Sequence, residues 1–125
     1  MTRLRAALII LALLPPLPAL AGGDPAAGEA VFRNRCSDCH SLTGEAGKAG
    51  PSLAGLIGRT AGTLPGYDFS PAMQASGIIW GADTLAQYLA APRKMVPQTR
   101  MAFNGLKRPG ESEDLLAWLL QAAAP

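Results

Sequence analysis

The chain has 125 residues, a length typical of one domain, with 11 Lys and Arg, 9 Asp and Glu, and a formal net charge of +2. Residues 1–21 hold two of the arginines, so the rest of the chain carries 9 basic and 9 acidic side chains. It lacks the basic surplus typical of nucleic-acid-binding proteins, and residues 22–125 contain no apolar run long enough to span a bilayer.

Residues 1–21 have the pattern of a secretory signal peptide. Two arginines precede an unbroken apolar run over residues 6–14, and two alanines near the end of the segment suit a cleavage site. A membrane anchor is the alternative, but a spanning helix needs about 20 apolar residues, and prolines interrupt this run. We expect cleavage after Ala21, export to a bacterial periplasm, and a mature domain over residues 22–125.

The mature chain shows helix signals at four places and no convincing strand. We expect helices over residues 25–35, 71–76 and 84–91, and from Glu111 onward. The first two begin at Asp24-Pro25 and Ser70-Pro71, where a capping side chain precedes a proline at the first helical position. Asp83 would cap the third, and acidic residues suit the start of the last. Loops rich in glycine and proline separate them, so the sequence predicts an all-α domain with long loops.

Cys36-Ser37-Asp38-Cys39-His40 contains both cysteines and the only histidine of the chain. This spacing is the attachment sequence for a c-type haem. Each thiol can add to one haem vinyl group, and His40 can ligate the iron as the proximal axial ligand. Zinc is disfavoured because a zinc site usually needs four protein ligands, or three plus water. A thioredoxin-like pair needs a βαβ setting that the chain lacks, and a disulfide closing so short a loop would stabilise little.

A haem iron ligated by His40 has a second axial position. Methionine is the next natural ligand after histidine, because a thioether favours the reduced iron. Met73, Met95 and Met101 are the candidates in the mature chain, although each could simply fill space in the core. Met101 lies in a loop braced by proline, with enough chain before it to circle the ring, so we favour Met101.

A ligating histidine also needs a hydrogen-bond acceptor for its second ring nitrogen. The Gly-rich loop after His40 contains Pro51, whose carbonyl can accept although its nitrogen cannot donate. The alternative is that Pro51 only shapes the loop, as prolines in loops usually do.

With these residues in place, the chain resembles class I cytochromes c of the mitochondrial and related bacterial type. The resemblance covers nearly all of residues 22–122 and rests on ordered blocks beyond the haem motif. These blocks are Gly50-Pro51-Ser52-Leu53-Ala54-Gly55, Gly58-Arg59, Pro65-Gly66-Tyr67, Gly77-Ile78-Ile79-Trp80, Thr84-Leu85 with Tyr88-Leu89, Pro97 with Thr99-Arg100-Met101-Ala102-Phe103, and Asp114-Leu115-Leu116-Ala117-Trp118-Leu119. The resemblance implies a single-domain class I cytochrome c fold, in which the N- and C-terminal helices cross and helices and long loops surround one covalently attached haem c.

The resemblance also implies a role for each site residue. Cys36 and Cys39 would carry the thioether bonds, His40 and Met101 would be the axial ligands, and the Pro51 carbonyl would accept from His40. The remaining residues expected at the haem are Arg59 and Trp80 at a buried propionate, Tyr88 and Thr99 near the methionine sulfur and the propionates, and Phe103 as a shield beside Met101. A guanidinium suits such a carboxylate because it can pair with it in a bidentate fork.

Three positions depart from the family pattern. Phe69 replaces a frequent tyrosine that binds a propionate, so that bond is absent. Met73 replaces a frequent asparagine and removes a polar group from the distal side. Gln98 replaces a usual glycine just before Thr99, which puts the local conformation of that loop in question.

Two protein ligands on the iron leave no place for a substrate, so we expect a one-electron carrier and not an enzyme. The expected partners are redox proteins, namely a quinol-oxidising complex, a terminal oxidase, a photosynthetic reaction centre or a dehydrogenase, and the chain is expected to be a monomer. Six basic residues near the expected haem edge could steer docking to acidic partners, or could be ordinary surface: Arg35, Lys48, Arg93, Lys94, Arg100 and Lys107.

Two alternatives to a general carrier stay open. One is a dedicated electron-accepting subunit of a single periplasmic dehydrogenase, which would use the same chemistry with one partner. The other is a haem peroxidase or ligand-binding protein, in which Met101 is displaced or absent from the iron.

Overall fold

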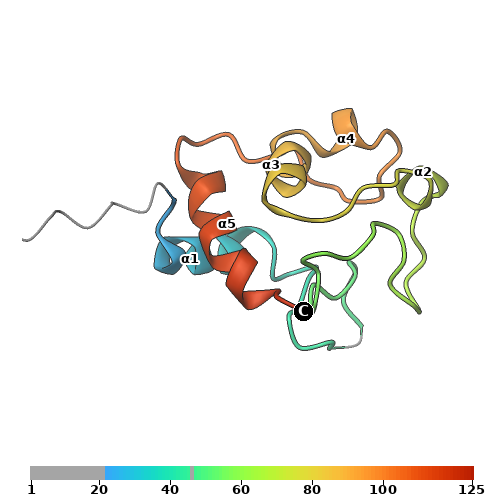
Figure 1. The fold of residues 1–125 in the computed structure, drawn as a ribbon, viewed down its shortest axis with the longest axis horizontal. Helices are drawn as coiled ribbons and strands as arrows, with labels where there is room; N and C mark the ends of the chain where they lie inside the picture. The colour runs from blue at the N-terminus through green and yellow to red at the C-terminus, as the bar shows by residue number, and fades with distance from the viewer. Residues whose placement is uncertain (1–21, 46) are drawn as a thin grey trace, which may run out of the picture.

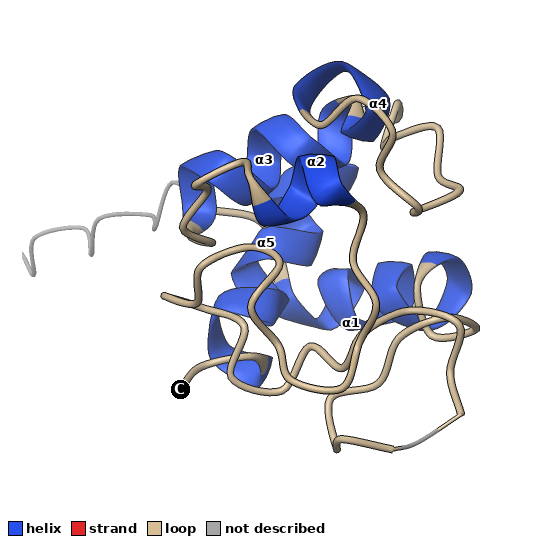
Figure 2. Cartoon of the chain, turned by 90° about the vertical axis from the view of Figure 1, so that its right-hand side faces the viewer, coloured by secondary structure: helices blue, strands red, loops and turns tan. Residues whose placement is uncertain are grey.

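The computed structural model describes residues 22–45 and 47–125. Its helices are α1 (Pro25–Arg35), α2 (Pro71–Gln74), α3 (Ala82–Ala90), α4 (Pro92–Met95) and α5 (Glu111–Ala122) (Figure 1). Long loops connect them, and the described part contains no strand beyond one isolated bridge between Thr60 and Ile79 (Figure 2). The predicted all-α class is therefore confirmed. The expected signal peptide at residues 1–21 lies outside the described residues, within which no helix has the length and apolar character needed to cross a membrane.

Helix α1 begins and ends where the sequence predicts. The Asp24 carboxylate accepts the Ala26 backbone N–H at 2.9 Å, and Pro25 occupies the first helical position. The same residue reaches the C-terminal helix, because its backbone N–H donates to the Asp114 carboxylate at 2.7 Å. The cap of α1 thus also fixes α1 against α5.

Helices α1 and α5 cross in close contact (Figure 1). A Cβ atom added at Gly28 would lie 1.9 Å from the Asp114 carbonyl oxygen, so only glycine fits at this point. The Phe32 and Trp118 rings pack beside the crossing with centroids 5.0 Å apart. Leu115 of α5 is only 1% exposed. The crossing of the terminal helices expected from the resemblance is present.

The middle helices differ from the prediction at their ends. Helix α2 has the expected cap, with the Ser70 hydroxyl accepting the Met73 N–H at 3.1 Å, but it ends at Gln74. The expectation that Asp83 caps the next helix is wrong. Helix α3 begins at Ala82 after Gly81, whose N–H donates to the Thr84 hydroxyl at 2.9 Å.

Helix α4 was not predicted at all. The sequence suggested that Pro92 only ends the preceding helix, whereas Pro92 also opens a four-residue helix through Met95. Helix α5 begins at Glu111 as expected, with its acidic residues in the first turn. Helix α3 packs against both α5 and α4, and α5 crosses α1 (Figures 1 and 2).

Candidate functional site

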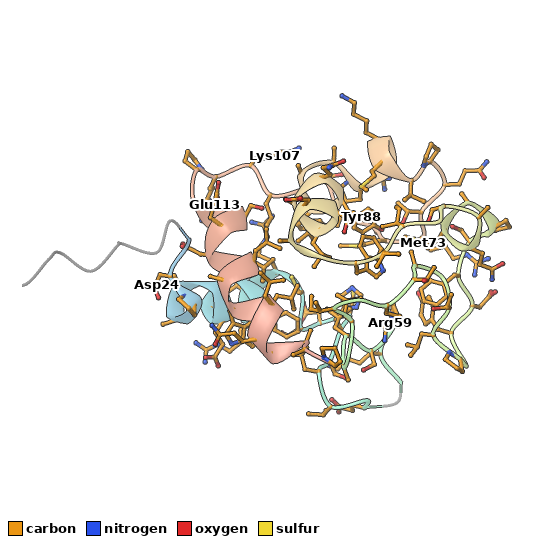
Figure 3. All side chains as sticks on the ribbon, viewed as in Figure 1. Asp24, Arg59, Met73, Tyr88, Lys107 and Glu113 are labelled. Atoms are coloured by element: carbon orange, nitrogen blue, oxygen red, sulfur yellow. The ribbon has the colours of Figure 1, made fainter. Side chains whose placement is uncertain are left out.

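The interior contains a mostly apolar cavity of about 290 Å³. All ten residues that the sequence and the resemblance assigned to a haem line this cavity, namely Cys36, Cys39, His40, Pro51, Arg59, Trp80, Tyr88, Thr99, Met101 and Phe103. Figure 3 shows Tyr88 of α3, Met73 of α2 and Arg59 of the preceding loop around the same region. A mostly apolar cavity of this size leaves many apolar side chains in contact with water unless a bound group covers them, and covering apolar surface is favourable. The fold therefore suits a large apolar group in its centre.

The two cysteines lie on the turn that follows α1. Cys36 is the C-cap of the helix, and the chain continues turning because the Cys39 and His40 N–H groups donate to the Cys36 carbonyl at 3.1 and 2.9 Å. Both thiols are free, and they line the same cavity. Burial raises the pKa of the Cys36 thiol to about 11, whereas reactive redox cysteines have lowered pKa values. The pair fits haem attachment better than thiol–disulfide chemistry.

The ring of His40 is held by the loop after it. Its Nδ1 lies 2.8 Å from the Pro51 carbonyl oxygen. A carbonyl can only accept, so Nδ1 carries the proton and Nε2 keeps its lone pair free for a metal. Burial lowers the pKa of His40, although the bond to Pro51 opposes this shift, and a neutral ring is the form that ligates.

Gly50 allows this arrangement, a role that does not follow from the sequence alone. A Cβ at this position would lie 2.6 Å from Cε1 of the His40 ring. The backbone of the loop therefore passes directly against the imidazole, with the Gly50 N–H donating to the Cys39 carbonyl at 2.8 Å. The sequence carried no specific signal for this contact, because a Gly-Pro pair ordinarily marks a turn or loop.

Met101 contributes a thioether to the cavity from an irregular loop. The Met101 N–H donates to the Thr99 hydroxyl at 3.4 Å, and that hydroxyl lies 2.6 Å from the Tyr88 hydroxyl. Burial raises the pKa of Tyr88, and the bond to Thr99 opposes this effect. Gln98 has a φ of 65°, a left-handed conformation that costs energy in a residue with a side chain. Met73 also lines the cavity, on α2.

Arg59 and Trp80 supply polar groups to the cavity wall. The Arg59 guanidinium donates to the Ser52 and Ala54 carbonyls at 3.0 and 3.1 Å, which fixes its plane and leaves further N–H groups available. Burial lowers the pKa of Arg59. Trp80 is buried and lines the same cavity. An anionic group at this wall would satisfy both side chains.

The six basic residues proposed for docking differ in their surroundings. Four are tied to other groups of the chain: Arg35 to Glu111, Lys48 to the Ser37 carbonyl, Arg100 to Asp68, and Lys107 to the Ala90 carbonyl. Arg93 and Lys94 of α4 are exposed.

Within residues 22–45 and 47–125, no group of three or more His, Cys, Asp and Glu side chains is arranged to hold a metal ion.

Comparisons with known proteins point to one family. A family model described as Cytochrome c matches residues 25–123. The cytochrome c of Sesamum indicum is 47% identical over 103 residues, which cover 82% of this chain and 93% of that protein. The cytochrome c of Cochliobolus lunatus is 46% identical over 100 residues, covering 79% and 93%. The cytochrome c type-1 of Ascaris suum is 42% identical over 103 residues, covering 82% and 92%.

These relatives contradict the expected location. They come from plants, a fungus and nematodes, and such eukaryotic cytochromes c point to the mitochondrial intermembrane space. The prediction of a bacterial periplasm, which rested on residues 1–21, is therefore wrong. A short segment with arginines and an apolar run does not by itself identify the membrane that a chain must cross.

Proposed function

The chain belongs to the cytochrome c family, and on that premise we propose that it carries single electrons on a haem c ligated by His40 and Met101. Members of the family are haem-based electron carriers and not enzymes, and they hold one covalently bound haem c with its iron. The haem supplies an iron that takes up and releases one electron. Residues 22–125 would form the domain that holds it.

The observation that carries the proposal is the geometry of His40. Its Nδ1 is occupied by the Pro51 carbonyl at 2.8 Å, so Nε2 is the nitrogen left to ligate the iron. The thiols of Cys36 and Cys39 line the same cavity and would hold the ring covalently. Met101 would supply the second ligand, and the Thr99 hydroxyl on its backbone N–H would hold its loop in position.

The other cavity residues would orient the macrocycle and control its surroundings. Arg59 and Trp80 would donate to a propionate, since Arg59 keeps free N–H groups after it binds two carbonyls. Tyr88 would act on the methionine sulfur through its bond with Thr99. Phe103 would exclude water beside Met101, because it lines the cavity next to that loop.

The partners would be redox proteins that exchange electrons with the haem edge. A respiratory role between a quinol-oxidising complex and a terminal oxidase is the version we propose, with the protein acting as a monomer. The exposed Arg93 and Lys94 support docking to acidic surfaces, because opposite charges steer association and make its rate fall with salt.

The test is the absorption spectrum of the haem-loaded protein in both oxidation states. We expect a sharp c-type spectrum on reduction, together with the weak red band of a methionine–ferric iron bond in the oxidised form. The band should disappear in Met101→Ala and persist in Met95→Ala, a matched methionine that does not line the cavity. A haem-loaded wild type without the band would contradict Met101 as ligand and favour a ligand-binding haem protein instead.

A further inference from the structure

A charge pair joins the end of α1 to the start of α5, and its Arg35 member lines the cavity. The Arg35 Nη1 lies 3.1 Å from the Glu111 Oε1, and the Glu111 side chain is 10% exposed. The second carboxylate oxygen, Oε2, is buried and has no hydrogen-bond partner among the described residues. From the sequence alone, Arg35 is a possible docking residue and Glu111 marks the start of a helix.

Both charges lie close to the haem attachment site. Arg35 lines the cavity and is adjacent in sequence to Cys36, and its guanidinium lies 5.5 Å above the centroid of the Phe103 ring, which lines the cavity too. The two charges also act on the thiol: burial is the main cause of the raised pKa of Cys36, Arg35 lowers that pKa, and Glu111 raises it. The Glu111 side chain is nearly buried, whereas the Arg35 side chain is 37% exposed, so solvent screens the charge of Arg35 more than that of Glu111.

Stability alone does not account for such a pair. Removing a carboxylate from water is costly, and replacing buried ion pairs with apolar residues is often neutral or stabilising. The unpaired Oε2 adds to this cost, because a buried acceptor without a donor loses its hydration. The position of Glu111 at the first turn of α5 offsets part of it, since the helix dipole favours a carboxylate there.

We propose that Arg35 and Glu111 form an electrostatic pair that sets the reduction potential of the haem, each residue shifting it in the opposite direction. The inference rests on the proposed electron-carrier function. Reduction adds one electron from a redox partner to the ferric iron and moves no proton, so the haem loses one unit of positive charge. The negative Glu111 favours the ferric state, and the positive Arg35 favours the ferrous state.

Two single substitutions give opposite expectations. Glu111→Gln keeps the shape of the side chain and leaves Arg35 uncompensated, so the midpoint potential should rise. Arg35→Gln leaves Glu111 uncompensated, so the potential should fall. Each change should alter the equilibrium constant for reduction about threefold to tenfold, and tenfold corresponds to about 59 mV for one electron. The double variant Arg35→Gln/Glu111→Gln should return close to the wild type.

Matched controls separate charge from packing. Arg35→Lys keeps the charge and loses the guanidinium fork, so its potential should stay near that of the wild type. Arg33 and Glu29 form an exposed pair on the same helix at 3.8 Å, with side chains 68% and 50% exposed. Arg33→Gln and Glu29→Gln remove the same charges where solvent screens them, and they should leave the potential almost unchanged.

The measurement is a spectroelectrochemical titration of the haem-loaded full chain, with the methionine–iron band recorded for each variant. Shifts of the same sign in Glu111→Gln and Arg35→Gln, or shifts no larger than those of the Arg33 and Glu29 controls, would overturn the proposal. If Arg35→Gln yields no haem-loaded protein, Glu111→Gln alone tests the proposal. A higher midpoint potential in that variant supports the proposal, and an unchanged or lower potential refutes it. Failure of the carrier function is a different result, since the wild type would then lack covalent haem or the band.

Discussion

The two ends of the chain and the loop that carries Met101 hold the cavity in different ways. The crossing of α1 and α5 depends on close packing, with Gly28 against the Asp114 carbonyl and Leu115 almost fully buried. The Met101 loop depends on a few polar contacts, chiefly the Thr99 hydroxyl between the Met101 N–H and Tyr88.

The difference separates a rigid framework from an adjustable element. Packing at a helix crossing is lost only if the helices separate, whereas a loop held by isolated hydrogen bonds can open locally at lower cost. The cysteines and His40 follow directly from the rigid α1. The one ligand that the proposed function places on the adjustable loop is Met101, so that loop would decide how firmly the second axial position is held.

The largest effect is expected from breaking the crossing. Gly28→Ala should destabilise the protein by about 3 kcal/mol, the upper end for overpacking, because its Cβ would lie 1.9 Å from the backbone oxygen of Asp114. This loss should outweigh the gain of about 1 kcal/mol in helix propensity that alanine normally brings. Denaturant unfolding of the haem-loaded protein measures it. Gly22→Ala is the control, since no atom lies within 4 Å of a Cβ there, and equal stability of the two variants would contradict the close crossing.

A smaller effect of the opposite sign is expected in the loop. Gln98 has a φ of 65°, and glycine adopts this conformation without steric cost. Gln98→Gly should therefore stabilise the folded protein by up to about 1 kcal/mol, because the relief of the left-handed penalty of about 1–2 kcal/mol exceeds the cost of the greater unfolded-state entropy of glycine. Gln87→Gly, in the exposed surface of α3, should instead lose about 1 kcal/mol. Comparing the unfolding midpoints of the two variants tests for backbone strain at Gln98. Lower stability than the wild type in both variants would argue against that strain.

Local signals in the sequence correctly predicted where the two terminal helices begin. Asp24-Pro25 and the acidic turn at Glu111 gave the starts of α1 and α5 because each signal lies within four residues of the helix end it defines. The start of α3 was wrong because the capping interaction runs from Thr84 back to Gly81, which has no side chain to suggest it. Helix α4 is only four residues long, too short for any periodicity to reveal it.

The candidate site likewise has residues that a local sequence signal identifies and residues that no local signal identifies. The haem motif is contiguous, so Cys36, Cys39 and His40 could be identified from five residues of sequence. Met101 and Pro51 were candidates from the chemistry of haem ligation, the remaining members came from the family resemblance, and the structure brings all of them to one cavity. The bond between Arg35 and Glu111 could not be predicted, since 76 positions separate them and only the crossing of α1 with α5 brings them together.

The hydroxyl of Tyr88 gives the smallest and most specific prediction about the Met101 loop. Tyr88→Phe removes the bond to Thr99 and should cost about 1 kcal/mol near neutral pH. Burial raises the pKa of Tyr88, so above its ordinary value near 10 the unfolded chain loses this proton while the folded chain keeps it. The folded state of the wild type is thus favoured below that pH and loses stability as the pH rises further.

The difference in the free energy of unfolding between wild type and Tyr88→Phe should therefore become smaller between pH 9 and pH 11, about one unit on each side of the ordinary tyrosine pKa. Denaturant unfolding at each pH measures it. Thr99→Val is the matched control, because it breaks the same hydrogen bond and keeps the buried phenol. It should lose stability with rising pH at least as steeply as the wild type, since the bond that opposes the pKa shift is gone. A constant gap between wild type and Tyr88→Phe across this range would mean that the phenol already ionises as freely in the folded chain as in the unfolded one.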